Sequence, residues 1–391
     1  MNAITEKEKC TGCSACANIC PQNCIIMYPD ADGFLYPKID NEKCVNCNKC
    51  KAICPVQPRA VTGLSGNPIV YAAYALDHDI VEHSSSGGVF SILSTYVINN
   101  GGVVFGAAFD TPDIVHHIAI KDLKSLPKLR GSKYVQSEIK YSYQDVEREL
   151  RQNRLVLFSG MPCQVAGLRH YLQIEYKNLI CIDTICHSVP SPKVWKYFIN
   201  ETESHTHSKI CSVNFRDKRD SWENYCLSFQ LANGKECIFR KNNNPYMNAF
   251  ISGLSIRPSC SQCIFKGINH QSDITLGDYW NVCNVQREAY NTRGTSLVII
   301  NTPRGISMLN LLRSALMLYP TSLNIALSFN PAYSKPSKLH PRRKLFFSNL
   351  DSLGAYQCIK VCLSPTKEEK MRAAIKQLAH RISKIIVKKH S

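Results

Sequence analysis

Eight of the 20 cysteines lie near the N-terminus in two copies of one pattern, C-x2-C-x2-C-x3-C-P. Three thiolates from one short loop can bind three irons of a 4Fe-4S cluster, and the fourth reaches the cluster of the other copy. The spacing therefore predicts two clusters that share eight ligands. One is held by Cys10, Cys13, Cys16 and Cys54, and the other by Cys44, Cys47, Cys50 and Cys20.

Paired zinc sites and disulfides are the competing interpretations of these cysteines. Zinc knuckles use two CxxC pairs, not three closely spaced cysteines followed by a fourth. Pro21 and Pro55, which close the two copies, end the local helix and turn the chain. The spacing therefore favours iron-sulfur clusters over zinc or disulfides.

Four later cysteines stand where they could meet. Cys163 and Cys186 each follow an apolar run expected to be a strand, and α/β sheets gather ligands at the carboxyl ends of their strands. Cys260 and Cys263 form a CxxC in a loop, which alone fits zinc, a redox pair or coincidence. Together the four thiolates would complete a third 4Fe-4S site, with Cys283 and His187 as alternative ligands.

A serine- and glycine-rich turn precedes a predicted helix over 89–98. In the run Ser84 to Gly88, exposed amides at a helix N-terminus could hold a phosphate, and Gly87 and Gly88 would let it approach. Because the G-x-G-x-x-G fingerprint is absent, a simple capped turn is the alternative. Lys133, in the basic turn RGSKYV, could meet a phosphate or face solvent.

The elements that must position these residues indicate an α+β protein: a two-cluster ferredoxin fold, then a larger α/β domain with a mixed sheet. Strands are expected at 69–75, 103–109, 155–158, 179–183, 274–280 and 296–300, and a hairpin at Asn233-Gly234. A helix is expected over 305–318, an extended segment over 329–350 and a basic amphipathic helix over 368–390. The expected domains are 1–60, with a linker at 56–68, then 61–155, 156–330 and 331–391.

Composition limits the class of protein. The formal net charge is +17, with 44% hydrophobic and 20% charged residues, and three bound clusters of about −2 each would bring it to about +11. Much of the excess lies in the last predicted helix, and no nucleic-acid motif accompanies it, so we expect no nucleic-acid partner. That helix could instead contact a membrane surface or a partner. The N-terminus lacks an apolar signal, and free thiolates favour a cytoplasmic location.

Six motifs in order carry a family resemblance: SSSGGVFSIL, RGSKYVQS, FSGMPCQVAGLR, ICHSVPSP, RPSCSQC and ITLGDYW. Together, behind the two-cluster ferredoxin pattern, they resemble the coenzyme F420 hydrogenase/dehydrogenase beta-subunit family. The resemblance implies bound FAD, a third 4Fe-4S cluster in the flavin domain and electron exchange with a hydride-accepting coenzyme. Longer versions of this kind resemble proteins of bacterial surface-polysaccharide clusters, so the acceptor need not be a deazaflavin.

On this resemblance, Ser86, Gly87, Gly88 and Lys133 are expected at the flavin phosphates and Asp278 near the flavin or substrate. Iron clusters move single electrons and a flavin can deliver a hydride, so the expected function is an iron-sulfur flavoprotein oxidoreductase. A redox partner protein or small electron donor would supply electrons, and a coenzyme or small organic molecule would accept them. No acid/base pair stands out, so the catalytic residues are unassigned. A non-catalytic electron-transfer subunit and an iron-sulfur sensor are the alternative functions.

Overall fold

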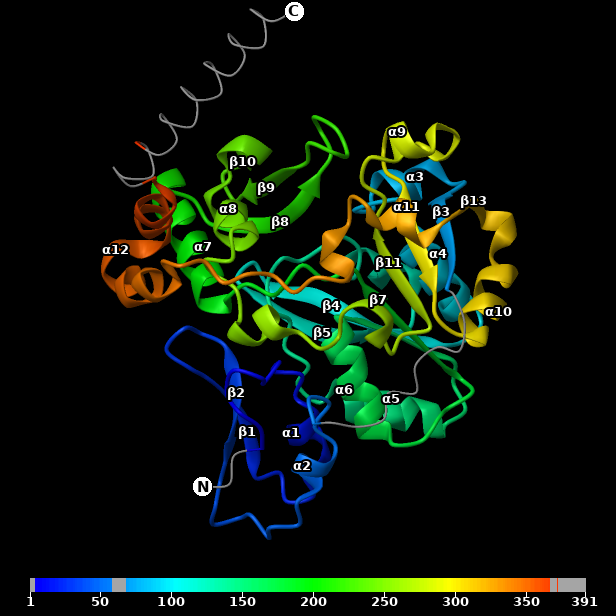
Figure 1. The fold of residues 1–391 in the computed structure, drawn as a ribbon, viewed down its shortest axis with the longest axis horizontal. Coiled ribbons are helices and arrows are strands. Elements are labelled where there is room, and N and C mark those ends of the chain that lie inside the picture. The colour runs from blue at the N-terminus through cyan, green and yellow to red at the C-terminus, as the bar shows by residue number, and fades with distance from the viewer. Residues whose placement is uncertain (1–3, 58–67, 366–370, 372–391) are drawn as a thin grey trace, which may run out of the picture.

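A small N-terminal region is built around the repeated cysteine pattern. The computed structural model describes residues 4–57, 68–365 and 371. Helices α1 (Ala15–Ile19) and α2 (Lys49–Ala52) each begin inside one cysteine motif, and strands β1 (Ile25–Pro29) and β2 (Leu35–Ile39) pair antiparallel between them. This region forms a lobe below the rest of the protein (Figure 1). The expected ferredoxin fold is confirmed.

An eight-stranded mixed sheet forms the centre of the larger region. Its strands, in spatial order, are β13 (Leu316–Thr321), β3 (Ile69–Ala75), β12 (Ser296–Ile300), β11 (Ile274–Asp278), β7 (Leu179–Thr184), β6 (Val156–Gly160), β4 (Val103–Thr111) and β5 (Ile114–Ile120). Strands β4, β6, β7 and β11 run parallel, and β3 has the same direction because β12 pairs antiparallel with both β11 and β3. The carboxyl ends of these five strands therefore lie along one edge.

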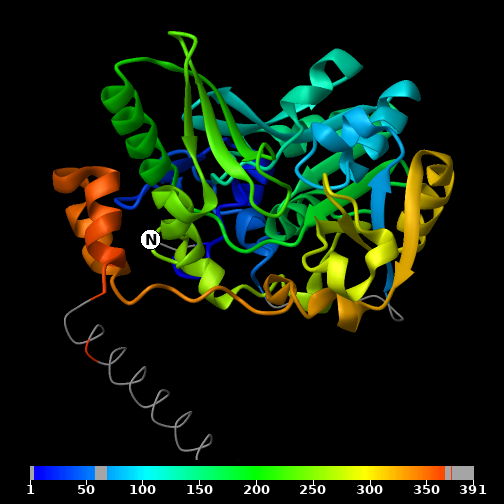
Figure 2. The same cartoon turned by 90° about the horizontal axis from the view of Figure 1, so that it is seen from above.

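Helices cover both faces of this sheet, as its continuous apolar strands require. On one face, α4 (Val89–Asn99) and α10 (Pro303–Leu311) bury side chains against the strands. The other face is covered by α5 (Ser142–Arg151), α6 (Pro162–Leu172), α9 (Val282–Val285) and α11 (Leu323–Leu327). Figure 2 shows this layering from above. A short helix, α3 (His78–Glu82), follows β3.

A second, three-stranded antiparallel sheet lies beside the large one. It consists of β8 (Ile210–Asp217), β9 (Cys226–Leu231) and β10 (Glu236–Phe239), and Asn233-Gly234 turns the predicted hairpin. Helices α7 (Pro192–Thr206), α8 (Pro245–Ile251) and α12 (Arg343–Leu363) share an aromatic core with this sheet. The described helices include none long and apolar enough to cross a bilayer.

Two sequence predictions are wrong near the C-terminus. The helix expected over 305–318 ends with α10 at Leu311, and Leu316 begins β13 instead, because edge pairing with β3 overrides helical periodicity there. The extended segment expected over 329–350 becomes helical at Arg343, where α12 buries Phe346 and Leu350. Most of the predicted helix over 368–390, and residues 58–67 of the linker, lie outside the described residues.

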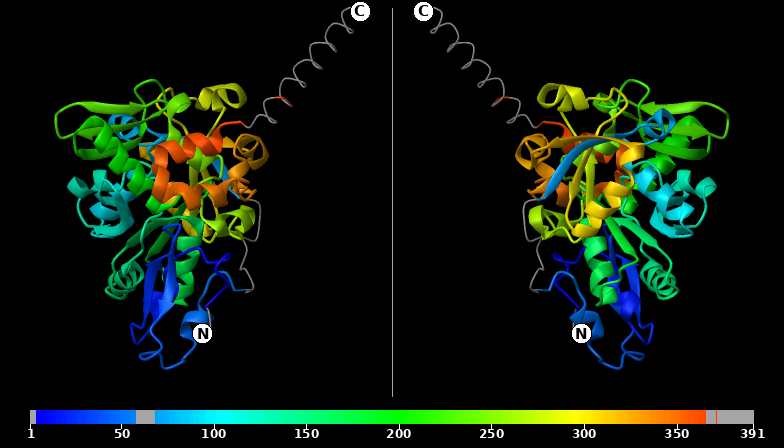
Figure 3. Two further views of the ribbon diagram at one scale, coloured as in Figure 1. Left: turned by 90° about the vertical axis from the view of Figure 1, so that its left-hand side faces the viewer. Right: turned by 90° about the vertical axis from the view of Figure 1, so that its right-hand side faces the viewer.

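The turn between β1 and β2 docks the N-terminal lobe onto the larger region. Asp32 pairs with Arg343 of α12 at 3.0 Å, and its carbonyl accepts a 2.5 Å hydrogen bond from the Ser191 hydroxyl. Gly33 has a φ of 84°, and a Cβ there would clash with Lys193 at the start of α7. Side views show this turn reaching up to the larger region (Figure 3). The lobe is therefore held by a glycine turn that leaves no room for a side chain.

We expect Gly33→Ala to destabilise the lobe more than Gly101→Ala does. Both glycines have positive φ, with 71° at Gly101, so both variants carry a backbone cost of about 1–2 kcal/mol. Only Gly33 has a neighbour in the way, and overpacking adds about 1–3 kcal/mol. Thermal unfolding and limited proteolysis of the two full-length variants measure the difference. Equal losses of stability would contradict the tight turn.

Candidate functional site

A cavity of about 540 Å³ opens at the edge where the parallel strands end. Its wall is formed by the loops that follow β3, β6, β7 and β11, together with residues 129–137 and 329–332. Ligands of open α/β sheets bind outside the carboxyl ends of strands, and cavities of about 300–1,000 Å³ hold cofactor-sized molecules. The cavity thus has the position and size of a cofactor site.

The loop before α4 supplies polar groups to this cavity. Gly88, at the N-cap of the 11-residue helix α4, has a φ of 84° that favours glycine. The Ser132 amide donates to Ser85 Oγ at 2.7 Å and ties this loop to the 129–137 loop. Ser86 Oγ and Arg130 Nε are buried without a hydrogen-bond partner in the described part of the chain. Buried polar atoms need partners, so this wall is suited to an anionic group at the helix N-terminus.

Two residues assigned to phosphate binding from the sequence are already engaged. Gly87 is not among the residues that line the cavity, and its amide donates to Ser296 Oγ at 2.9 Å. Its hydrogen atoms face the Ala73 carbonyl, so Gly87 allows close packing of the loop on the sheet. Lys133 lines the cavity, but its ammonium donates to the carbonyls of Lys128, Arg130 and Gly131. Lys133 therefore braces its own loop in this structure.

Asp278 lies in the cavity wall as part of an ion pair. Its carboxylate contacts Arg216 through both oxygens, at 2.7 and 3.2 Å, and accepts from Trp222 Nε1 at 3.2 Å. The Arg216 guanidinium lies 4.0 Å from the Tyr225 ring centroid. Burial alone would lower the pKa of Arg216, but the Asp278 charge keeps it above its usual value. Asp278 therefore anchors a buried arginine at an aromatic end of the cavity.

The structure brings Cys163, Cys186, Cys260 and Cys263 together. Burial, and then the charges of Cys263, Cys186, Cys13 and Cys260, hold the pKa of Cys163 well above its usual value. Burial also raises the pKa of Cys186 to about 12 and that of Cys260 to about 11. The Lys266 ammonium, which donates to the Cys186 carbonyl, is a nearby positive charge. Four thiols with raised pKa values release protons on binding iron, so this group fits a thiolate-ligated cluster.

Cys163 and Cys186 also line the cavity, which the other two cysteines do not. His187, the alternative ligand, lines it as well and packs edge-on against Phe250 at 5.2 Å. Cys283 lies on α9 instead. The four-cysteine site thus shares a wall with the candidate cofactor site.

The N-terminal cysteines form two sets that differ in exposure. Burial, and then the charges of Cys13, Cys10 and Cys54, keep the pKa of Cys16 well above its usual value, so these four lie together as an inner set. Cys50 interacts with Cys47 and Cys20, and Cys24 contacts both Cys20 and Cys44, which groups the remaining four as an outer set. Cys13, Cys16 and Cys54 are buried, whereas Cys47 is exposed.

The inner set lies against the helix that carries Cys163. A Cβ on Gly167 of α6 would lie 3.0 Å from Cys13 Cβ and 3.1 Å from Cys13 Sγ. Gly167 follows Cys163 by one helical turn, which places both on one face. Thr11, in the loop between Cys10 and Cys13, lines the cavity itself. The inner set therefore adjoins both the four-cysteine site and the cavity.

Among residues 4–57, 68–365 and 371, no three His, Cys, Asp or Glu side chains are grouped to hold a single metal ion. A 4Fe-4S cluster binds each thiolate through a different iron, so its ligands stand further apart than those of one ion. The ligand assignments of the three cysteine sets stay predictions.

Comparison with protein families decides the relationship. Residues 9–57 match the 4Fe-4S dicluster domain, and residues 153–323 match the C-terminal domain of the coenzyme F420 hydrogenase/dehydrogenase beta-subunit family. The chain joins these two domains. It is thus an iron-sulfur electron-transfer protein related to F420 hydrogenase beta subunits, as the motifs predicted.

A chain of the F420-reducing [NiFe] hydrogenase complex from Methanosarcina barkeri, in its xenon-derivatised structure, is similar over 75% of this chain and 95% of that one. The sequence identity is 15% and the TM-score 0.48. No curated protein matches. The beta-subunit match includes the four cysteines of the larger domain and Asp278, whereas the Ser84 to Gly88 loop precedes it.

Sequence reasoning missed several residues of the beta-subunit-like site. His117, in β5, is stacked on Phe158, and its Nδ1 and Nε2 lie 2.6 and 3.0 Å from Ser137 Oγ and the Ser159 carbonyl. Burial lowers the pKa of His117 to about 4, so this cavity-lining ring is neutral at pH 7. Arg216 and Arg257 were missed too. Alternation along a strand can mark His117 and Arg216 as buried, but it does not show what they face, and Arg257 lies in a loop without such a pattern.

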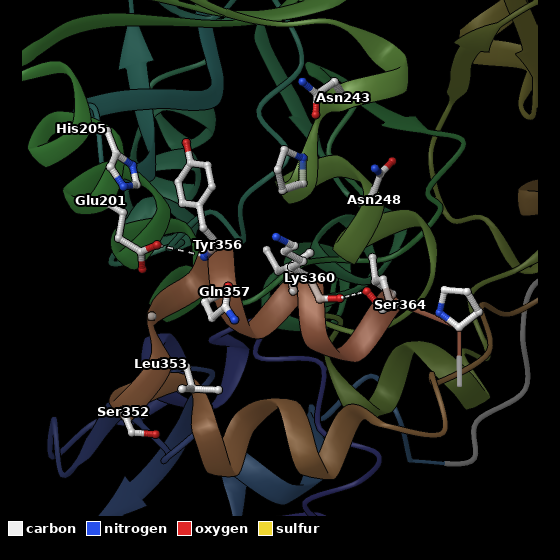
Figure 4. A pocket seen from close by; sticks show the side chains of 15 residues that line it. Glu201, His205, Asn243, Asn248, Ser352, Leu353, Tyr356, Gln357, Lys360 and Ser364 are labelled. Atoms are coloured by element: carbon white, nitrogen blue, oxygen red, sulfur yellow. Dashed lines mark hydrogen bonds between the residues drawn. The ribbon is translucent and has the colours of Figure 1, made fainter. Parts of the chain in front are cut away.

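A second cavity, of about 870 Å³, lies between α7, α8 and α12 (Figure 4). Glu201 accepts a 2.9 Å hydrogen bond from the Tyr356 amide there, close to the kink at Gly354. No cysteine is among its described lining residues. Glu201 thus joins α7 to α12 beside this cavity.

We expect Cys163→Ala to remove one cluster from the full-length protein. Anaerobically reconstituted wild type should contain about twelve irons per chain, and the variant about eight, because three thiolates no longer complete the site. Cys181→Ala is the matched control, since Cys181 is fully buried in the neighbouring strand β7. Iron and sulfide analysis measures both variants. Equal iron in Cys163→Ala and wild type would exclude the third cluster.

Proposed function

We propose that the protein is an iron-sulfur flavoprotein oxidoreductase that binds FAD in the 540 Å³ cavity. It exchanges single electrons with a redox partner protein or small donor, and two electrons with a coenzyme or small organic molecule. One observation carries the proposal: Cys163, Cys186 and Thr11 lie in the same cavity wall as the polar loop before α4. A cofactor bound there would lie beside the four-cysteine site and the inner cysteine set.

The cavity residues fit a flavin. Ser86 Oγ and Arg130 Nε lack partners in the described protein and can contact phosphate oxygens. Tyr225, Phe250 and Trp280 provide an apolar wall for a ring system. When bound, clusters exchange single electrons and a flavin exchanges one or two, so together they can couple a one-electron donor to a hydride acceptor. The chain's own part is to hold these groups close and keep water out.

The exposure of the cysteines suggests an order for the relay. Cys47 of the outer set is exposed, whereas three of the four inner cysteines are buried and Cys13 lies against α6. An external one-electron donor can therefore approach the outer set, and the inner set is the step between it and the cavity. The reducing cytoplasm would suit such thiolates. A role in a surface-polysaccharide pathway stays a prediction.

Turnover by the purified chain separates this function from that of a non-catalytic electron-transfer subunit. With reduced viologen as donor, the enzyme should reduce an added hydride-accepting coenzyme or small organic molecule without another protein. If the clusters and the flavin are reduced but none of the candidate acceptors is, the result would favour the role of a non-catalytic electron-transfer subunit.

We expect Ser86→Ala to weaken flavin binding without destabilising the flavin-free protein. A lost hydrogen bond to a charged group costs about 1.5–3 kcal/mol, which lowers affinity by about ten- to hundredfold. The flavin-free variant should be at least as stable as wild type, because a buried unsatisfied hydroxyl is removed. FAD titration by fluorescence and thermal unfolding measure the two effects.

Ser94→Ala is the matched control for Ser86→Ala. Ser94 Oγ is also buried and without a partner in the described chain, and Ser94 lies on α4, the helix that follows the Ser86 loop, but it does not line the cavity. Its removal should leave FAD affinity unchanged. If wild type binds no FAD, or if both variants bind it equally well, FAD is not held in this cavity.

A further inference from the structure

Arg257 is a fully buried arginine between the two domains. It directly precedes Pro258, where the short helix that carries Cys260 begins, and its amide donates to the Val189 carbonyl at 3.0 Å. Its side chain extends away from that loop into the N-terminal lobe. One residue thus connects the segment of the four-cysteine site with the inner cysteine set.

All three guanidinium nitrogens of Arg257 are engaged in the lobe or next to it. Nε donates to the Cys10 carbonyl at 2.7 Å, and Nη2 donates to the Leu35 carbonyl at 2.9 Å and lies 3.7 Å from Cys10 Sγ. Nη1 donates to Gln136 Oε1 at 3.1 Å, and Gln136 in turn donates to the Thr11 carbonyl. A Cβ on Gly12 would lie 2.8 Å from both Arg257 Nη1 and Gln136 Nε2. The arginine and glutamine therefore clamp the loop that begins the inner set.

No carboxylate within the described ranges forms an ion pair with Arg257, although the buried Arg216 and the partly buried Arg169 each have one. Arg216 pairs with Asp278, and Arg169 with Asp273. A buried charge without a counter-charge is costly. The guanidinium lies 4.3 Å from the Tyr36 ring centroid, and Nη2 lies 3.7 Å from Cys10 Sγ. The thiolate group that contains Cys10 can therefore serve as its counter-anion.

We propose that Arg257 is a positioning residue that serves as the counter-charge of the inner cluster and raises its reduction potential above that of the outer cluster. This inference rests on the proposed function only in requiring the two N-terminal clusters. Reduction adds negative charge to a cluster, so a buried cation and hydrogen bonds to its sulfurs stabilise the reduced form.

The outer set has no comparable buried cation among its described neighbours. Lys43 and Lys49, which flank Cys44 and Cys50, are exposed, and Lys51 on the other side of Cys50 is only half-buried, so solvent and salt screen their charges more than that of Arg257. The difference makes transfer from the outer to the inner cluster favourable. Electrons that arrive at the exposed edge are therefore directed toward the cavity.

Redox titration followed by electron paramagnetic resonance tests this assignment in the full-length, anaerobically reconstituted protein. Arg257→Gln should make the potential of one N-terminal cluster more negative and leave the other unchanged. The expected shift is at least a tenfold change in the reduction equilibrium, about 59 mV for one electron.

Arg343→Gln is the matched control, because Arg343 also holds the lobe, through Asp32, but contacts no cysteine. It should increase proteolytic release of the lobe without shifting either potential. Unchanged potentials in Arg257→Gln, or equal shifts in both variants, would overturn the proposal.

Arg257→Lys keeps the positive charge but loses the planar guanidinium with its several N–H donors. This variant provides the test if Arg257→Gln does not assemble its clusters. We then expect a smaller negative shift of the same single potential, and an unchanged potential would refute the role. FAD binding is measured on the same samples. If the wild-type protein binds no FAD but Arg257→Gln still shifts one cluster potential, the proposed flavin site is refuted and the assignment of Arg257 stands.

Discussion

The arrangement of this protein depends on one close contact, between the cysteine loop of the N-terminal lobe and helix α6. Cys13 fits against Gly167, one turn beyond Cys163, where no larger side chain would leave room. In the proposed relay, this glycine sets how closely the inner cysteine set approaches the larger domain. The turn at Gly33 and the Arg257 clamp hold the lobe in the same position from two other sides.

The sheet topology explains why one edge of the larger domain carries the chemistry. Five strands end in the same direction, so loops that are far apart in the sequence meet around one cavity. Cys163 and Cys186 follow β6 and β7 directly, and Asp278 ends β11. A rigid sheet thus positions thiolates and polar groups that the connecting loops alone would not hold in place.

Charge is distributed unevenly along this path. Lys266 is a buried cation beside Cys186, and Arg257 is one beside Cys10. Near the outer set, Lys43 and Lys49 face solvent and Lys51 is half-buried. A protein can adjust cluster potentials through such charges and hydrogen bonds without changing a ligand. In the proposed relay, the same chain would both space the redox groups and adjust their potentials.

The sequence alone determined the ferredoxin lobe, because its cysteine ligands lie within short loops and their spacing is typical of 4Fe-4S ligands. It also indicated the central strands, the Asn233-Gly234 hairpin and the four cysteines that the structure brings together. Only the tertiary structure decided that Gly87 packs on the sheet, that Lys133 braces its own loop, and that residues from Leu316 form an edge strand. It alone placed Arg257 against Cys10, since a contact across 247 positions leaves no local pattern in the sequence. Ligand spacing within a short loop can be read from the sequence, whereas the partner of a buried charge depends on how distant segments pack.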